Sequence, residues 1–289
     1  MTKKKKDHLP VQRLLLPWYI LATGKILSSI SSFLASRFAA KLFLTPYKYK
    51  LPKREKEMDE NSKQTPLELP ASGREIIVYE YGNSPKKVLL AHGWSGRGTQ
   101  MSKIAKALVQ NGYSTLSFDA PAHGKAPGKM SSMLYFSEAI HLMEEKYGPF
   151  EALVGHSLGG MASLRAIKEG LKVKRLVIIG TANSITAITI NFVENLKMNK
   201  KVAERMKTYF DMKFGEDMDA HSGAVSAKNV STPTLVIHDT EDVDVHVTSA
   251  YEIAEALDNS ELYITTGLGH RRILGDQKVI NKITTFIAV

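Results

Sequence analysis

The sequence predicts an α/β fold in which a mostly parallel, doubly wound sheet carries helices on both faces. From residue 73 onward, short runs rich in Val, Ile and Leu alternate with longer amphipathic runs. Uninterrupted apolar runs are typical of strands covered on both faces, and regular alternation of strands with helices indicates parallel pairing. The 289 residues suffice for one large domain, and they contain no repeat of the kind that builds solenoids or propellers.

The expected elements follow one another at short intervals along this part of the chain. The expected strands cover residues 75–81, 87–91, 114–119, 151–155, 175–180, 234–238 and 261–265. The expected helices cover residues 101–110, 135–146, 158–168, 249–257 and 279–287. The interval 181–231 has no strand-like run but contains helical stretches at 188–196 and 201–214. We interpret this interval as a helical cap inserted over the ends of the strands.

Residues 1–72 are interpreted as a basic N-terminal extension and linker, which precede a single domain at residues 73–289. Residues 1–56 contain thirteen Lys and Arg but only two acidic residues, whereas the rest of the chain contains 26 basic and 27 acidic residues. The net charge of +10 therefore belongs to the extension. No nucleic-acid-binding motif accompanies this charge, so we expect no nucleic-acid partner.

The extension is predicted to contain one helix over about residues 25–44, followed by a polar linker at 48–70. Three interpretations of it stay open. In the first, the helix packs on the domain through an apolar stripe of Leu27, Ile30, Leu34 and Phe38. In the second, residues 1–56 make a peripheral contact with a membrane. In the third, the tetralysine and the apolar run after it form a signal peptide or an anchor.

The chain has no cysteine. This absence excludes disulfides, thiolate metal sites and a cysteine nucleophile. It also fits a reducing compartment, and we therefore expect a cytoplasmic location.

The main functional motif is the segment Gly-His-Ser-Leu-Gly-Gly at residues 155–160, between an expected strand and an expected helix. Its spacing is G-x-S-x-G. A nucleophilic serine has to lie on a sharp, strained turn to expose its hydroxyl group, and the glycines leave room for the strand and helix to pack closely. Ser157 is therefore the predicted nucleophile, and it needs a base within hydrogen-bond reach.

The base and the acid are expected after two later strands, because functional groups of open α/β sheets gather at the carboxyl ends of the strands. His270 follows the last expected strand on a glycine-rich loop and is the predicted general base. Asp242 follows the preceding strand and is the predicted acid that orients the imidazole, with Glu241 and Asp244 as alternatives. The order Ser157, Asp242, His270 suits this architecture.

Two backbone N–H groups are expected to bind the oxyanion of the reaction. One belongs to Leu158, directly after the nucleophile, and the other to Trp94, where a preceding glycine permits the necessary turn. Other histidines near the motifs are interpreted as structural residues that hydrogen bond within their loops: His92, His123 and His156. Residues 238–246 are rich in His, Asp and Glu but lack a defined ligand spacing, so we expect no metal.

These motifs resemble those of the α/β-hydrolase superfamily of serine hydrolases. The resemblance covers residues 73–289 and depends on five segments in the order of the family: LLAHGW, FDAPAHG, VGHSLGG, LVIHDTED and GLGH. It implies the α/β-hydrolase fold, with Ser157 as nucleophile, Asp242 as acid and His270 as base. It also implies an oxyanion hole made by the Trp94 and Leu158 amides, and no cofactor.

The predicted activity is hydrolysis of a carboxylic ester, a thioester or an amide, and a carboxylesterase is the default. Its partner would be a small ester or acyl substrate, whose binding residues are left open, as is the oligomeric state. One alternative is a lipase or lysophospholipase that the extension recruits to lipid. A second is an acyltransferase or peptidase with the same triad. The third is a binding module that keeps the fold without catalysis.

Overall fold

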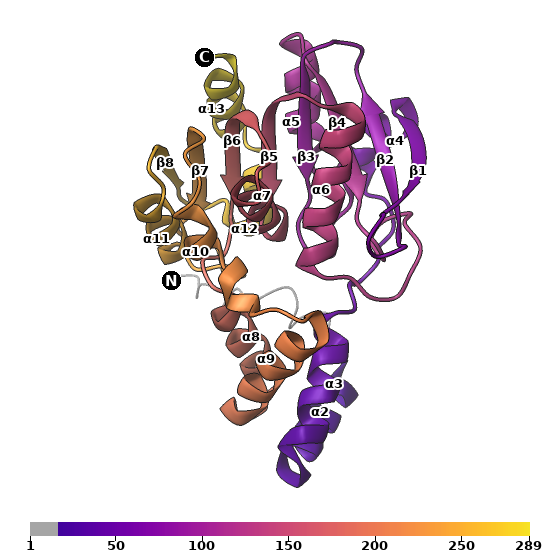
Figure 1. Cartoon of the computed structure of the whole chain (residues 1–289), viewed down its shortest axis with the longest axis vertical. Helices are drawn as coiled ribbons and strands as arrows, with labels where there is room; N and C mark the ends of the chain where they lie inside the picture. Colours follow the sequence, from indigo (N-terminus) through magenta and orange to yellow (C-terminus); the bar gives the residue numbers. More distant parts are fainter. Residues whose placement is uncertain (1–16) are drawn as a thin grey trace, which may run out of the picture.

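The computed structural model describes residues 17–289, and it has the mostly parallel, doubly wound sheet that the sequence predicts (Figure 1). In these residues, eight strands lie in the order β1-β2-β4-β3-β5-β6-β7-β8. β2 pairs antiparallel with both β1 and β4, and all other neighbours are parallel. The strands are β1 (Lys63–Glu68), β2 (Glu75–Tyr81), β3 (Lys87–Ala91), β4 (Ser114–Asp119), β5 (Phe150–His156), β6 (Val173–Ile179), β7 (Thr234–Asp239) and β8 (Ser260–Thr265).

Helices cover both faces of the sheet. α6, α7 and α11 bury apolar side chains on one face, and α5 and α13 do so on the other. Successive strand residues point to opposite faces, so in β5 Leu153 joins the first core and Val154 the second. The helices are α2 (Trp18–Ile30), α3 (Ser32–Phe43), α4 (Lys56–Asn61), α5 (Ser102–Gln110), α6 (Met133–Tyr147), α7 (Leu158–Lys168), α8 (Ile185–Asn195), α9 (Lys200–Phe214), α10 (Gly223–Ala227), α11 (Thr248–Ala256), α12 (Gly269–Arg272) and α13 (Gln277–Ala288). Short 3-10 helices lie at Lys53–Glu55, Gly98–Met101, Met218–His221 and Ile273–Gly275.

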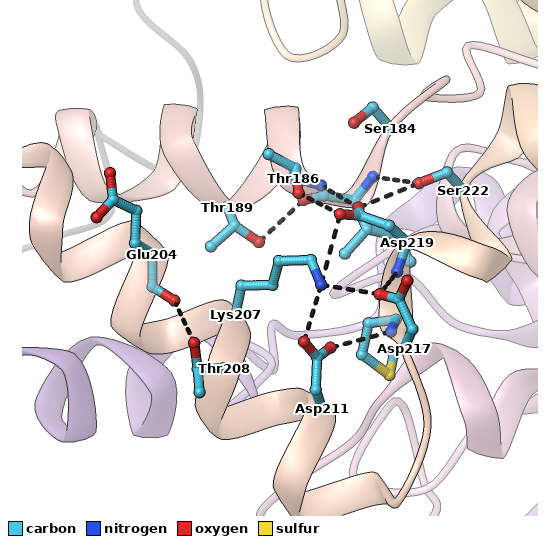
Figure 2. Close-up of polar contacts among 12 residues, drawn as sticks. Ser184, Thr186, Thr189, Glu204, Lys207, Thr208, Asp211, Asp217, Asp219 and Ser222 are labelled. Carbon is cyan, nitrogen blue, oxygen red and sulfur yellow. Dashed lines mark hydrogen bonds and ion pairs between the residues drawn. The ribbon is translucent and has the colours of Figure 1, made fainter.

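The chain between β6 and β7 forms a helical insertion of α8, α9 and α10. Lys207 of α9 holds this insertion together, because its Nζ lies 2.8 Å from carboxylate oxygens of both Asp211 and Asp217 (Figure 2). Asp219 accepts hydrogen bonds from the N–H and the hydroxyl of Thr186, at 3.0 and 2.6 Å (Figure 2). These contacts tie the segment after α9 back to the start of α8.

The N-terminal extension is helical but differs from the prediction. Two helices, α2 and α3, replace the single helix expected over about 25–44, because Ser31 is extended at φ −154° and its side chain caps α3 by accepting the N–H of Leu34. The predicted apolar stripe is wrong for two of its members, since Ile30 is 73% exposed and Leu34 is 50% exposed. The buried face of α3 consists instead of the small residues Ala35, Ser36, Ala39 and Ala40.

Residues 48–70, which we interpreted as a polar linker, contain the first strand of the sheet. β1 pairs with β2 along its whole length, from Lys63 opposite Glu80 to Glu68 opposite Glu75. It is an edge strand without a buried residue, and it includes Pro66. Polar residues and proline are typical of edge strands, so this strand has no apolar run that a sequence pattern could detect.

The helices of the extension pack on the insertion. α3 lies against α9, and α2 lies against α3. The turn between α8 and α9 also reaches α2, where Met198 covers Gly24 and the N–H of Asn199 donates to the Ser28 hydroxyl at 3.3 Å. Figure 1 shows α2, α3, α8 and α9 together at one end of the molecule. None of the helices within residues 17–289 is long and apolar enough to cross a membrane.

Candidate active site

Ser157 lies on the sharp turn between β5 and α7 that the sequence predicts. Its backbone is strained for a residue with a side chain, at φ 53° and ψ −116°. The N–H of Ser157 donates to the carbonyl of Ile179 at the end of β6, at 2.8 Å. A side chain at Gly159 would overlap the carbonyl of Ala91, so this glycine lets α7 approach β3 closely. The turn therefore holds the serine at the carboxyl ends of the central strands.

His270 and Asp242 form a hydrogen-bonded pair. Nδ1 of His270 lies 2.7 Å from Oδ2 of Asp242, and only 1% of the Asp242 side chain is exposed. The other carboxylate oxygen accepts the N–H groups of Asp244 and Val245, at 2.9 and 2.8 Å. Of the three acids that the sequence leaves open, Asp242 is thus the one that contacts the imidazole. His270 itself lies in the short helix α12, where we expected a loop.

Hydrogen bonds keep the Asp242 carboxylate ionised despite its burial. Burial raises the pKa of a carboxyl group, but donation from His238 and His270 and from the N–H of Val245 outweighs it, and the pKa of Asp242 falls below its usual range. Nε2 of His238 lies 3.4 Å from the same oxygen that His270 contacts. A permanently charged carboxylate is what stabilises an imidazolium beside it.

The serine turn and the His270–Asp242 pair meet around Gly180. This residue directly follows Ile179, which accepts the Ser157 N–H, and its own φ is +59°. A Cβ atom at Gly180 would lie 3.1 Å from Nδ1 of His270 and 3.4 Å from Oδ2 of Asp242. Among the hydrogen bonds of residues 17–289, none joins the Ser157 hydroxyl to the imidazole. In hydrolases without substrate this bond is often long and shortens on binding.

His156 positions the backbone of His270. Its Nε2 lies 2.9 Å from the carbonyl oxygen of His270, and the two ring centroids are 4.7 Å apart. Burial lowers the pKa of His156 to about 3, so its ring is neutral and can donate from Nε2 to this carbonyl. The structure confirms the structural interpretation of His156, but no sequence pattern indicated its partner, which lies 114 positions away.

The loop after β3 brings Trp94 beside the serine turn. A Cβ atom at Gly93 would lie 3.1 Å from the Cβ of Ser157, so only a glycine allows this approach. The side chain of Gln100 accepts the Gly93 N–H at 2.9 Å and fixes the loop. Among the hydrogen bonds of residues 17–289, none has the N–H of Trp94 or the N–H of Leu158 as its donor. Leu158 opens α7, where the first N–H groups lack partners within the helix.

Asp119, at the end of β4, holds the same loop in place through hydrogen bonds. It accepts hydrogen bonds from the Gly98 N–H at 2.7 Å, the Lys125 N–H at 2.6 Å and the Tyr79 hydroxyl at 2.8 Å. His123, in the same motif, lies 3.0 Å from the Pro121 carbonyl through Nδ1. The segment FDAPAHG, residues 118–124, therefore holds the backbone of two loops in place, and one of these loops carries Trp94.

His92 also serves a structural purpose. Its Nδ1 lies 2.7 Å from the Gly93 carbonyl, and its Nε2 accepts the N–H of Ala120 at 3.1 Å. Burial lowers the pKa of His92 well below the usual range for histidine, so the ring stays neutral.

Aromatic side chains from three parts of the chain gather beside Trp94, and sequence reasoning missed them. Phe43, at the end of α3, stacks on Trp94 with ring centroids 6.5 Å apart and an interplanar angle of 25°. The same ring contacts Phe192 of α8 at 5.1 Å and Phe210 of α9 at 5.5 Å. Phe43 lies outside the segment that resembles the superfamily, so no motif could have indicated it.

Comparison with known proteins agrees with the fold. Residues 86–212 match the family model described as alpha/beta hydrolase fold. Over 127 residues the chain is 35% identical to the sn-1-specific diacylglycerol lipase ABHD11 of Danio rerio. This match covers 42% of this chain and 39% of the length of that relative. It is also 22% identical to the non-heme haloperoxidase of Rhodococcus erythropolis over 254 residues, or 71% of this chain and 92% of the relative.

Solved structures show the same architecture. The esterase Pf2001 of Pyrococcus furiosus superposes with a TM-score of 0.65 at 18% identity, covering 85% of this chain and 97% of the esterase. A likeness at this identity shows the fold alone. The sequence match over residues 86–212 and this superposition both agree with the observed architecture, which is an α/β-hydrolase fold.

Proposed function

We propose that this protein is a serine hydrolase that cleaves carboxylic esters through Ser157, His270 and Asp242. The observation that carries the proposal is the 2.7 Å hydrogen bond between a buried, ionised Asp242 and His270, next to a serine on a strained turn. The 35% identity, over 127 residues, to a relative named as a diacylglycerol lipase supports a hydrolase with an ester substrate.

In the first half of the reaction, Oγ of Ser157 attacks the ester carbonyl carbon while Nε2 of His270 takes the hydroxyl proton. The carbonyl oxygen becomes an oxyanion and accepts hydrogen bonds from the N–H groups of Trp94 and Leu158. His270 then gives its proton to the leaving alcohol oxygen as the carbon–oxygen bond breaks, and the acyl group stays on Ser157.

In the second half, a water molecule attacks the acyl carbonyl and His270 takes its proton. The proton passes to Oγ of Ser157 as the acid leaves. Asp242 keeps the Nδ1–H tautomer of His270, so that Nε2 faces the serine, and it stabilises the imidazolium formed in both halves. Preorganised N–H donors cost no reorganisation at the moment of reaction, and losing one such donor slows other serine hydrolases by roughly 10²–10³.

Among esters, we favour those with an apolar acyl group. The half-buried ring of Phe43 stacks on Trp94, one of the proposed oxyanion donors, and the rings of Phe192 and Phe210 pack on Phe43, so this wall beside Trp94 is apolar. An apolar acyl chain would gain from contact with this wall. The relative named as a diacylglycerol lipase is consistent with this preference.

Hydrolysis of p-nitrophenyl esters of graded acyl length tests the proposal. We expect turnover by the wild type and its loss in Ser157→Ala, with rates that rise from acetate toward medium-length chains. Ser163→Ala is the matched control, because Ser163 is a buried serine of α7, the helix that follows Ser157, and its hydroxyl donates to the Gly159 carbonyl at 2.6 Å. Equal turnover by wild type and Ser157→Ala would contradict the proposal.

A further inference from the structure

The exposed apolar side chains of α2 and the start of α3 form a surface that the proposed reaction does not use. Within residues 17–289, thirteen large apolar side chains are exposed, and six of them lie between residues 18 and 34. We call these six the α2–α3 apolar face: Trp18, Tyr19, Ile26, Ile30, Phe33 and Leu34, each 50% to 78% exposed. Single exposed apolar side chains are ordinary, but a cluster of them marks an interaction site.

Within residues 17–289, the rest of the protein leaves this side of α2 open. At about 100° per residue, Trp18, Ile26 and Ile30 fall on one side of the helix. The opposite side is covered, because Met198 packs on Gly24 and Asn199 hydrogen bonds to Ser28. Figure 1 shows α2 and α3 projecting at the end of the molecule. The apolar face is therefore presented to the surroundings.

Positive charge surrounds the apolar face. Residues 17–44 contain three basic residues and no acidic residue, and Lys25 is exposed on α2. Exposed lysines also lie in the turn between α8 and α9, at Lys197, and at the start of α9, at Lys200 and Lys201. Asn199 of this turn hydrogen bonds to α2. The sequence before α2 includes four consecutive lysines. A partner with an apolar interior and an anionic surface would match both properties.

We propose that the α2–α3 apolar face docks this protein on a lipid bilayer with anionic headgroups. α2 has 13 residues and is about 20 Å long, too short for a hydrocarbon core of about 30 Å. It would therefore lie along the surface with its apolar side among the acyl chains. Trp18 and Tyr19 are the residue types that gather at the boundary between headgroups and acyl chains, and lysines attract anionic headgroups.

α3 connects this face to the candidate active site. The helix begins at the apolar face, with Phe33 and Leu34, and ends at Phe43, which stacks on Trp94. The distance along the helix is about 15 Å. Docking would turn this end of the molecule toward lipid, so that acyl lipids would be the substrates within reach. This last step depends on the proposed function, whereas the docking itself does not.

Co-sedimentation with vesicles tests the docking. We expect the full chain to bind vesicles of phosphatidylcholine with phosphatidylglycerol, and to bind pure phosphatidylcholine weakly. The variant Trp18→Ser/Ile26→Ser/Ile30→Ser should lose roughly tenfold or more in affinity. Lys197→Gln/Lys200→Gln/Lys201→Gln should weaken binding mainly at low salt. The matched control is Tyr251→Ser/Leu262→Ser, which removes exposed apolar side chains from α11 and β8 and should bind like the wild type.

Three results would overturn the docking proposal. The folded wild type could stay in the supernatant with anionic vesicles, or the apolar variant could bind as well as the wild type. Light scattering could instead find a dimer that the apolar variant converts to a monomer, which would make the face an interface between copies of this chain. Ser157→Ala separates the two proposals, because it should lose hydrolysis and keep vesicle binding.

Discussion

Phe43, in a helix outside the sheet domain, stacks on Trp94, whose N–H is a proposed oxyanion donor, with ring centroids 6.5 Å apart. The contact makes the N-terminal extension part of the candidate active site. Phe43 also contacts Phe192 and Phe210, so one ring joins the extension, the insertion and the loop that carries Trp94.

Phe43→Ala should therefore change substrate preference. Removing the ring takes away apolar surface beside Trp94, and we expect kcat/KM for medium-length esters to fall roughly tenfold while that for acetate changes less. The matched control is Phe33→Ala, in the same helix, where the ring is 51% exposed. Steady-state kinetics on both variants with water-soluble esters check this. Equal losses for all acyl lengths would count against an acyl-binding role.

Asp242→Asn should remove most of the activity without unfolding the protein. An amide can donate to Nδ1 and would hold His270 in the wrong tautomer, so we expect kcat to fall by about 10³–10⁴. Asp244→Asn is the control, because Asp244 contributes its backbone N–H to Asp242 and this group survives the substitution. If Asp244→Asn were as damaging as Asp242→Asn, the choice of acid would be wrong.

Gly180→Ala should impair catalysis beyond its effect on stability. At a φ of +59°, a residue with a side chain lowers the free energy of unfolding by about 1–2 kcal/mol relative to glycine. The new Cβ would also lie 3.1 Å from Nδ1 of His270. Gly215→Ala is the matched control, since Gly215 has φ +75° and no atom within 4 Å of the added Cβ. Both variants should lose similar stability in urea, and Gly180→Ala alone should lose at least about tenfold in kcat.

The protein should lose stability as the pH falls from 7 toward 5. Burial lowers the pKa of His123 to about 4 and that of His156 to about 3, and it also lowers the pKa of His92. The unfolded chain binds protons at these histidines below about pH 6.5, whereas the folded chain does not. In this window, each of these histidines should therefore lower the free energy of unfolding by roughly 1 kcal/mol for each pH unit.

Urea unfolding at several pH values measures this dependence. His123→Gln should reduce the slope of the unfolding free energy against pH, because one buried neutral histidine is gone. A stability that stays constant between pH 7 and pH 5 would contradict the expectation.

The parallel strands of the sheet follow from local patterns in the sequence. Buried runs such as 87–91 and 234–238 are apolar because both faces are covered, and the structure confirms them as β3 and β7 within a residue. β1 was missed because an edge strand needs no such run. The break at Ser31 was missed because an apolar helical pattern continues across it, and only the extended backbone of Ser31 separates the two helices.

The candidate site could be predicted in part. Ser157, Asp242 and His270 each come shortly after an apolar run that forms a strand, so a local sequence pattern indicates each of them. The pairing of His156 with the His270 carbonyl and the contact of Phe43 with Trp94 join residues 114 and about 50 positions apart. Such contacts depend on how distant helices and loops pack, which no local pattern encodes.

The most direct test of the account is the site at which a fluorophosphonate reacts. This probe reacts preferentially with an activated serine, so mass spectrometry of the digested adduct should find the label on the peptide that contains Ser157. His270→Gln should remain folded and unlabelled. A folded wild type without any label, or a label that persists at another residue in Ser157→Ala, would contradict the claim that His270 and Asp242 activate Ser157.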